Sequence, residues 1–206
     1  MLNSLLWNYC TENWLELSGF IVALFSIYFQ IKQKPIYWPI SIIMVSLYIF
    51  IYYQSKFYAD MSLQFYYLIV SFYGWYFWIF GKRKNANKKT NSTVKVAKTS
   101  SRQKIFLFLL TILFFIIISF ILINFTDSTV PYGDAFTTAL SFTATWLLAK
   151  KYIENWLIWL IVNPVSVGLY VYKELYLTAV LFVILSILAV VGYYQWKKDF
   201  IHERIA

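Results

Sequence analysis

The sequence has few of the residues on which enzymes and metalloproteins depend. Its 206 residues include one cysteine, Cys10, and one histidine, His202, which excludes an intramolecular disulfide and a histidine-cluster metal site. It contains no Gly-x-Ser-x-Gly, His-Glu-x-x-His or Gly-Lys-Ser/Thr motif. We therefore expect a protein that is not an enzyme, does not hydrolyse ATP, and needs neither a cofactor nor a metal ion.

Charge is also scarce. Charged residues make up 13% of the chain, against 61% hydrophobic and 22% aromatic residues. A water-soluble domain typically has about 25% charged residues. Most of the surface of this protein is therefore expected to face lipid.

Seven long apolar stretches contain most of the hydrophobic residues. Each approaches the ~20 residues that a helix needs to cross ~30 Å of hydrocarbon, whereas barrel strands are shorter and alternate their two faces. The expected fold class is an all-α integral membrane protein with seven transmembrane helices. The stretches are 15–31, 36–53, 61–80, 105–123, 134–149, 156–172 and 176–196.

The distribution of Lys and Arg indicates an orientation. Sixteen of the eighteen lie on one side of the predicted membrane, nine of them in the connection 81–104, and only Lys56 and Lys173 lie on the other. Basic residues collect in cytoplasmic loops, so we expect the N-terminus outside and the C-terminus in the cytoplasm. The net charge of +9 then reflects orientation and attraction to anionic lipid, not a nucleic-acid partner. The connection 81–104 has no acidic residue and is expected to be disordered.

The chain repeats itself at an offset of 118 residues. Residues 32–78 align with 150–196 without a gap, and the matches include tryptophans and a glycine. We expect two three-helix repeats, 14–80 and 134–196, separated by the basic cytoplasmic loop 81–104 and a linker helix, 105–124. Because the linker helix restores the chain direction, the repeats would be parallel, as in the SWEET-type plan, with solute bound near the midplane between them. The matching pairs include Trp38/Trp156, Gly74/Gly192 and Trp78/Trp196.

A polar and aromatic face is predicted on the sixth helix. Trp156, Trp159 and Asn163 are spaced i, i+3 and i+7 and so share one side of a helix. An amide at membrane depth must find a partner, so Asn163 is either bonded to another helix or in contact with a solute. The alternative for the tryptophans is a belt at the membrane surface, to which we assign Trp38. Pro164 follows and is expected to kink the helix.

A second such face is predicted on the third helix, where Gln64 and Tyr67 are the candidate solute contacts. Its polar residues have apolar counterparts in the other repeat, which suits a site for an asymmetric solute. The alternative for Gln64 is a bond between helices. Glu16 and Asp134 occupy matching helix ends, where they are either exposed caps or an attractive outer entrance for a cation.

Three motifs resemble those of the PnuC family of bacterial nicotinamide riboside transporters. They are the runs Asn155-Trp-x-x-Trp-x-x-x-Asn163, Tyr58-Ala-Asp-Met-Ser-Leu-Gln64 and Tyr73-Gly-Trp-Tyr-Phe-Trp78. The resemblance implies a homotrimer in the bacterial inner membrane, with a separate pathway in each protomer. It also implies passive uptake of a cationic nucleoside that a cytoplasmic kinase then traps, with Gln64, Trp156, Trp159 and Asn163 facing the solute. Close relatives of similar appearance carry thiamine, which is the alternative solute, and a non-transporting membrane scaffold is a second alternative.

Overall fold

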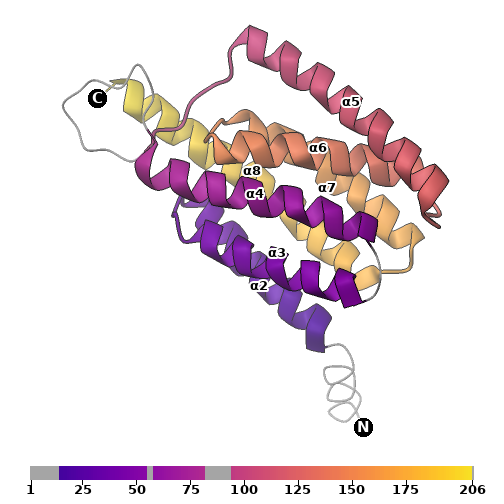
Figure 1. The fold of residues 1–206 in the computed structure, drawn as a ribbon. Helices are drawn as coiled ribbons and strands as arrows, with labels where there is room; N and C mark the ends of the chain where they lie inside the picture. The colour runs from indigo at the N-terminus through magenta and orange to yellow at the C-terminus, as the bar shows by residue number, and fades with distance from the viewer. Residues whose placement is uncertain (1–13, 55–57, 82–93, 206) are drawn as a thin grey trace.

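The computed structural model describes residues 14–54, 58–81 and 94–205. Seven helices account for nearly all of them, arranged side by side in an elongated bundle (Figure 1). Their bounds are α2 Trp14–Ile31, α3 Tyr37–Gln54, α4 Tyr58–Phe80, α5 Ser101–Phe125, α6 Pro131–Ala149, α7 Glu154–Tyr172 and α8 Tyr176–Ile205.

Each of the seven expected apolar stretches is helical, so the all-helical class is confirmed. The main difference is at the end of the chain, where α8 continues past Trp196 to Ile205. Among the described residues, α5, α7 and most of α8 are long and apolar enough to cross a membrane. α7 continues through Pro164 without ending.

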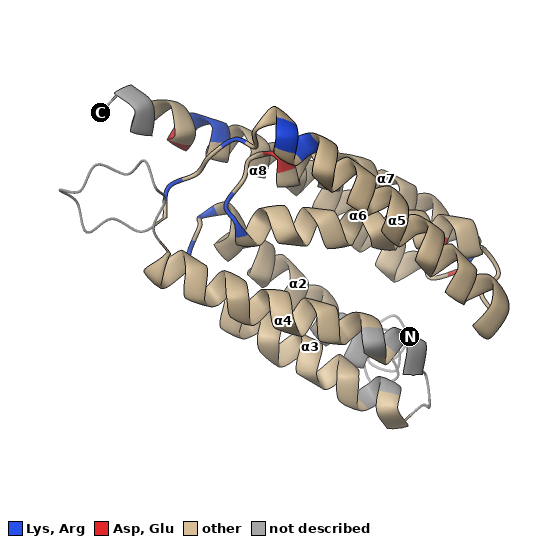
Figure 2. Cartoon of the chain, turned by 45° about the horizontal axis from the view of Figure 1, so that its top comes forward, with Lys and Arg blue, Asp and Glu red and all other residues tan. Residues whose placement is uncertain are grey.

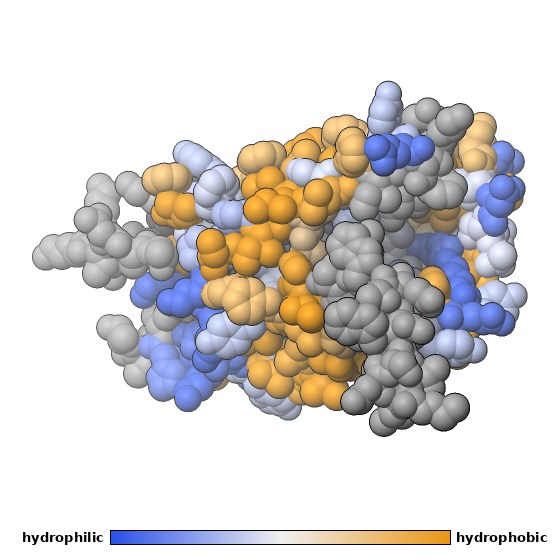
Figure 3. All heavy atoms as spheres, turned by 90° about the horizontal axis from the view of Figure 1, so that it is seen from below, coloured by the Kyte–Doolittle hydropathy of each residue, from blue (hydrophilic) through white to orange (hydrophobic). Residues whose placement is uncertain are grey.

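The surface of the bundle is apolar around its middle and polar at its ends. Figure 3 shows a broad hydrophobic band between two hydrophilic regions. α5 lies at the edge of the bundle and packs mainly against α6, so large apolar side chains along it are exposed (Figure 1). In water these side chains would favour aggregation, and a lipid environment removes that cost.

One end of the bundle carries most of the described Lys and Arg residues (Figure 2). We call it the basic end; it is where α2 and α6 finish and where α3 and α7 begin. The opposite end has the pair Lys173 and Asp134, whose Nζ and Oδ1 atoms lie 2.7 Å apart. The basic end includes Lys32, Lys34, Lys95, Lys98, Lys150, Lys151, Lys197 and Lys198.

Residues 94–99, which we call the strap, are docked across the basic end. The Ala97 N–H donates to the Lys151 carbonyl, and the Ile153 N–H donates to the Ala97 carbonyl, both at 3.0 Å. Val94 and Val96 are buried, and the buried Lys151 ammonium donates to the Val94 carbonyl at 2.9 Å. The expected disorder of this loop is therefore wrong for the strap, because alternating valines give it an apolar face to bury. The preceding residues 82–93 lie outside the described residues.

Residues 118 positions apart make matching contacts. The rings of Trp38 and Trp78 meet edge to face at 5.4 Å, and those of Trp156 and Trp196 meet in the same way at 5.6 Å. The helix-ending turns also match, since the Lys34 N–H donates to the Phe29 carbonyl and the Tyr152 N–H donates to the Leu147 carbonyl, both at 2.9 Å. The positive φ angles in these turns, 54° at Gln33 and 52° at Lys151, are 118 positions apart as well.

The assignment of Trp38 to a surface belt is wrong. Its side chain is 0% exposed, and its ring lies over Gly74, where an added Cβ would come within 2.4 Å of the ring. The Trp156 ring lies over Gly192 in the same way, and a Cβ added at Gly192 would come within 2.5 Å of that ring. Helix pairs in membranes gain contact area where a small residue lets a partner approach closely, so both tryptophans are core residues.

Candidate solute-binding cavity

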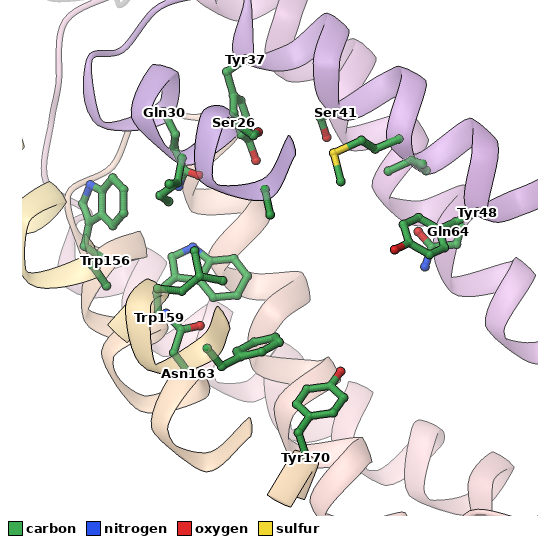
Figure 4. A pocket seen from close by; sticks show the side chains of 17 residues that line it. Ser26, Gln30, Tyr37, Ser41, Tyr48, Gln64, Trp156, Trp159, Asn163 and Tyr170 are labelled. Atoms are coloured by element: carbon green, nitrogen blue, oxygen red, sulfur yellow. The ribbon is translucent and has the colours of Figure 1, made fainter. Parts of the chain in front are cut away.

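A cavity of about 480 Å³ lies between α2, α3, α4, α7 and α8. Its volume falls within the roughly 300–1,000 Å³ typical of small-molecule sites. Figure 4 shows side chains of α7 on one side of the space and those of α2 and α3 on the other. The lining residues are Ala23, Ser26, Ile27, Gln30, Tyr37, Ser41, Met44, Val45, Tyr48, Gln64, Trp156, Trp159, Asn163, Tyr170, Phe182, Leu185 and Ala189.

The predicted face of α7 lines this cavity. Trp156, Trp159 and Asn163 come to the wall together because their spacing places them on one side of the helix. Trp156 is fully buried against Gly192 and Trp196, so it forms part of the wall, whereas the ring of Trp159 is partly exposed. Asn155, which begins the motif, is buried and donates from Nδ2 to the Tyr152 carbonyl at 2.6 Å, so it stabilises the turn that leads into α7.

The two candidate solute contacts of α4, Gln64 and Tyr67, lie in different places. Gln64 reaches the cavity, but Tyr67 is not among its lining residues. The ring of Tyr67 packs edge to face on Phe142 at 5.4 Å, in a second apolar cluster between α4, α5 and α6. Ser71, one turn after Tyr67 on α4, is also buried, with its hydroxyl 3.1 Å from that of Ser41.

The structure describes the side chain of one of the two candidate entrance carboxylates, Asp134, and not that of the other, Glu16. Asp134 is at the start of α6, at the end opposite the basic end, and accepts hydrogen bonds from Lys173 Nζ and Ser128 Oγ. Asp134 and Lys173 form a half-buried ion pair. The paired carboxylate attracts an approaching cation less strongly than a free carboxylate would. Glu16 belongs to α2, but its side chain lies outside the described residues.

Sequence reasoning missed the contribution of α2 and most of that of α3. Ser26 and Gln30 are buried polar residues spaced i, i+4, so they share a side of an otherwise apolar helix. That pattern is a usable signal. Ser41 and Val45 are the repeat counterparts of Trp159 and Asn163, so the repeat could have placed them at the wall as well. Tyr48 and Tyr170 had no distinguishing signal in so Tyr-rich a chain.

The chemistry of the lining suits a flat cation. Six aromatic side chains and three amide side chains, those of Gln30, Gln64 and Asn163, border the cavity. None of the seventeen lining residues is Asp, Glu, Lys, Arg or His. Aromatic faces attract cations without a counter-charge. In addition, the indole N–H groups of Trp156 and Trp159 are buried and make no hydrogen bond within the described part of the chain. Such donors are what a bound solute or water with acceptor groups would satisfy.

The bundle and its cavity define a multi-helix membrane transporter for small molecules. The chain belongs to the family described as nicotinamide mononucleotide transporter, whose model matches residues 13–198. Membership of this family confirms the resemblance to PnuC proteins and the expectation that the protein is a transporter rather than an enzyme.

Individual relatives are of comparable length. The chain is 26% identical to the nicotinamide riboside transporter PnuC of Escherichia coli (strain K12) over 203 residues, covering 89% of this chain and 85% of that protein. It is 26% identical to a protein of the same name from Neisseria mucosa, covering 91% of this chain and 73% of the relative. A crystal structure titled as the vitamin B3 transporter PnuC superposes with a TM-score of 0.70 at 23% identity, covering 96% of this chain and 86% of the other. The last likeness supports the fold.

Proposed function

We propose that the protein carries nicotinamide riboside across the bacterial inner membrane by facilitated diffusion. The observation that carries the proposal is the cavity between α2, α3, α4, α7 and α8, which combines Trp159 and Asn163 of one half with Gln64 of the other. The solute is the one for which the PnuC relatives of Escherichia coli and Neisseria mucosa are named. The scaffold alternative is less well supported, because Trp159, Asn163 and Gln64 border an internal space and not the lipid-facing surface of α5.

Recognition follows from the lining residues. The pyridinium ring would stack on Trp159, where desolvation strengthens the attraction between a cation and an aromatic face to about 2 kcal/mol or more. The amides of Asn163 and Gln64 would bond the ribose hydroxyls and the carboxamide, each of which has donors and acceptors. The buried Trp156 supports this wall from behind.

The energetics follow from what the lining does not contain. Proton relays in transporters use Asp, Glu or His side chains within the bundle, and the residues around this cavity include none of these. The solute would therefore move down its own gradient. Phosphorylation by a cytoplasmic kinase would then keep the internal concentration of the free solute low.

We expect proteoliposomes containing the purified protein to equilibrate radiolabelled nicotinamide riboside without ATP. An imposed proton gradient should leave both the rate and the final level unchanged. Enclosing a nicotinamide riboside kinase with ATP should raise the retained label above the external concentration. Phosphorylation removes the free solute inside the vesicle, so more solute enters to restore its equilibrium across the membrane.

The same vesicles distinguish the alternatives. Accumulation above the external concentration with no kinase enclosed would contradict facilitated diffusion. If the vesicles took up labelled thiamine and not nicotinamide riboside, thiamine would be the solute. No uptake of either solute by protein that binds neither would favour the scaffold.

We propose further that all seven helices span the membrane as two parallel three-helix repeats, 14–80 and 134–196, joined by the linker helix, with the basic end in the cytoplasm. The matching tryptophan contacts and turns at an offset of 118 residues support the repeats. The collection of Lys and Arg at one end supports the orientation. The family resemblance adds a homotrimer with one pathway in each protomer.

This orientation predicts the labelling of the single thiol. Cys10 precedes α2, whose far end belongs to the basic end, so a membrane-impermeant maleimide should label it in intact spheroplasts. Denatured protein serves as the control that the thiol is reactive. Labelling that appears only after lysis would reverse the proposed topology.

A further inference from the structure

Four tryptophans form a continuous row across the basic end of the bundle. In order along the row they are Trp38, Trp78, Trp196 and Trp156, with neighbouring ring centroids 5.4, 6.1 and 5.6 Å apart. All four side chains are 0% exposed. Two belong to each half, and the central contact, between Trp78 and Trp196, joins the halves.

The two central indoles make reciprocal hydrogen bonds between the halves. Trp78 Nε1 on α4 donates to the carbonyls of Leu148 and Ala149, at 3.3 and 3.2 Å, at the end of α6. Trp196 Nε1 on α8 donates to the Ile31 carbonyl, at 3.1 Å, at the end of α2. Ile31 and Ala149 are 118 residues apart, as are Trp78 and Trp196, so each half holds the first helix of the other by the same bond.

This row adjoins the cavity on the side toward the basic end, through its member Trp156. Trp156 belongs to both the row and the cavity lining, and the cavity residue Tyr37 stacks on Trp78 with ring centroids 6.3 Å apart. The strap lies over the same cluster through Val96, and the Lys151 ammonium lies 4.7 Å from the centre of the Trp78 ring. These contacts therefore lie between the cavity lining and the basic end.

We propose that Trp78 and Trp196 are the gate residues of the transport cycle, and that breaking their indole hydrogen bonds between the halves opens the cavity toward the basic end. The inference rests on the proposed function, because only a transporter needs this end to open. The outer two tryptophans favour opening, since Trp38 Nε1 and Trp156 Nε1 are buried with no hydrogen-bond partner among the described residues. Water entering the opened row would satisfy these two N–H groups, which offsets the loss of the hydrogen bonds made by Trp78 and Trp196. A passive carrier needs such a balance, because no energy source drives its gate.

The test uses Trp78→Phe and Trp196→Phe, which keep an aromatic ring and remove the N–H donor. Cys10 is replaced by serine and the cavity residue Ser41 by cysteine, and inside-out vesicles are treated with a membrane-impermeant methanethiosulfonate reagent. Each Phe variant should be labelled about 2- to 12-fold faster than its parent, the factor expected for one lost hydrogen bond. The double variant should exceed either. Trp75→Phe, at an exposed position of α4, is the matched control and should leave the rate unchanged.

A second measurement keeps the proposal testable if the Phe variants fold poorly. Gln33, in the turn after α2, donates from Nε2 to Asp199 Oδ2 of α8 at 2.8 Å, so this pair also joins the halves at the basic end. In Gln33→Cys/Asp199→Cys, a short reducible cross-linker should stop transport while leaving solute binding intact, and reductant should restore it. Unchanged labelling in folded Phe variants, or undiminished transport by the cross-linked protein, would overturn the gate. The labelling assay needs no solute, so it reports on the gate even if nicotinamide riboside proves to be the wrong solute.

Discussion

Trp159→Ala is expected to weaken the binding of nicotinamide riboside by roughly 30- to 1,000-fold, about 2–4 kcal/mol. The partly exposed ring of Trp159 is the aromatic surface on which the pyridinium would stack, and alanine removes both the stacking area and the attraction to the cation. Titration calorimetry of the purified protein measures the change. Binding that stays within a factor of two of the parent would place the solute elsewhere.

The amides of the same site should follow with smaller losses. Asn163→Ala or Gln64→Ala leaves a hydroxyl or carboxamide of the solute without its partner, which costs about 1–3 kcal/mol, or roughly 5- to 150-fold in the dissociation constant. Both amides would contact one solute, so the double variant should lose at least as much affinity as the weaker-binding single variant, and its departure from additivity measures their coupling.

Matched controls separate a binding effect from a general one. Trp75→Ala removes an indole from an exposed position of α4, and Asn124→Ala removes an amide from an exposed position of α5. Neither residue borders the cavity, so both variants should bind like the parent. Tyr67→Ala tests the separation of Gln64 from Tyr67, and we expect it to lower stability more than affinity, because Tyr67 packs on Phe142.

Gly74→Ala and Gly192→Ala are expected to lower the free energy of unfolding by about 1–3 kcal/mol each, or roughly 2–12 °C in the unfolding midpoint. The added Cβ would lie 2.4 Å from the Trp38 ring or 2.5 Å from the Trp156 ring. Neither ring can move aside, because both are fully enclosed. Thermal unfolding in detergent, followed by intrinsic fluorescence, measures the shift.

Gly168→Ala is the matched control for these two variants. It lies within α7, and apart from its two chain neighbours and the backbone of its own helix, no atom of the described residues comes within 4 Å of an added Cβ. Alanine there should be neutral or stabilise the protein by up to about 1 kcal/mol, because alanine favours the helix more than glycine does. A loss at Gly168 equal to that at Gly192 would show that the tryptophan contact is not the cause.

The sequence predicted the elements well because lipid imposes a strong constraint on local composition. An uninterrupted apolar run of sufficient length must be helical in a bilayer, and all seven runs are helices. The face of α7 was predictable for a similar reason. Within one helix, spacing alone decides that Trp156, Trp159 and Asn163 lie on the same side.

The tertiary structure decided which face meets which neighbour, since that depends on contacts between residues far apart in the chain. Gln64 and Tyr67 are three positions apart on α4, yet Gln64 lines the cavity and Tyr67 packs on Phe142 of α6. Asp134 is paired because the fold brings Lys173 to it, 39 positions later. Local periodicity gives the direction of a side chain from its own helix axis, whereas its partner depends on how the helices pack.

The repeat is the one place where sequence carried long-range information, and its reach was limited. The offset of 118 residues identified Trp38 with Trp156 and Trp78 with Trp196. It could not indicate that Trp38 would be buried over Gly74, or that each half would donate an indole hydrogen bond to the other. Those bonds run from the third helix of each half to the first helix of the other. The sequence by itself therefore determined the helices, the basic end and the face of α7. The packing of the two halves decided the cavity and the tryptophan row, because both include residues from each half.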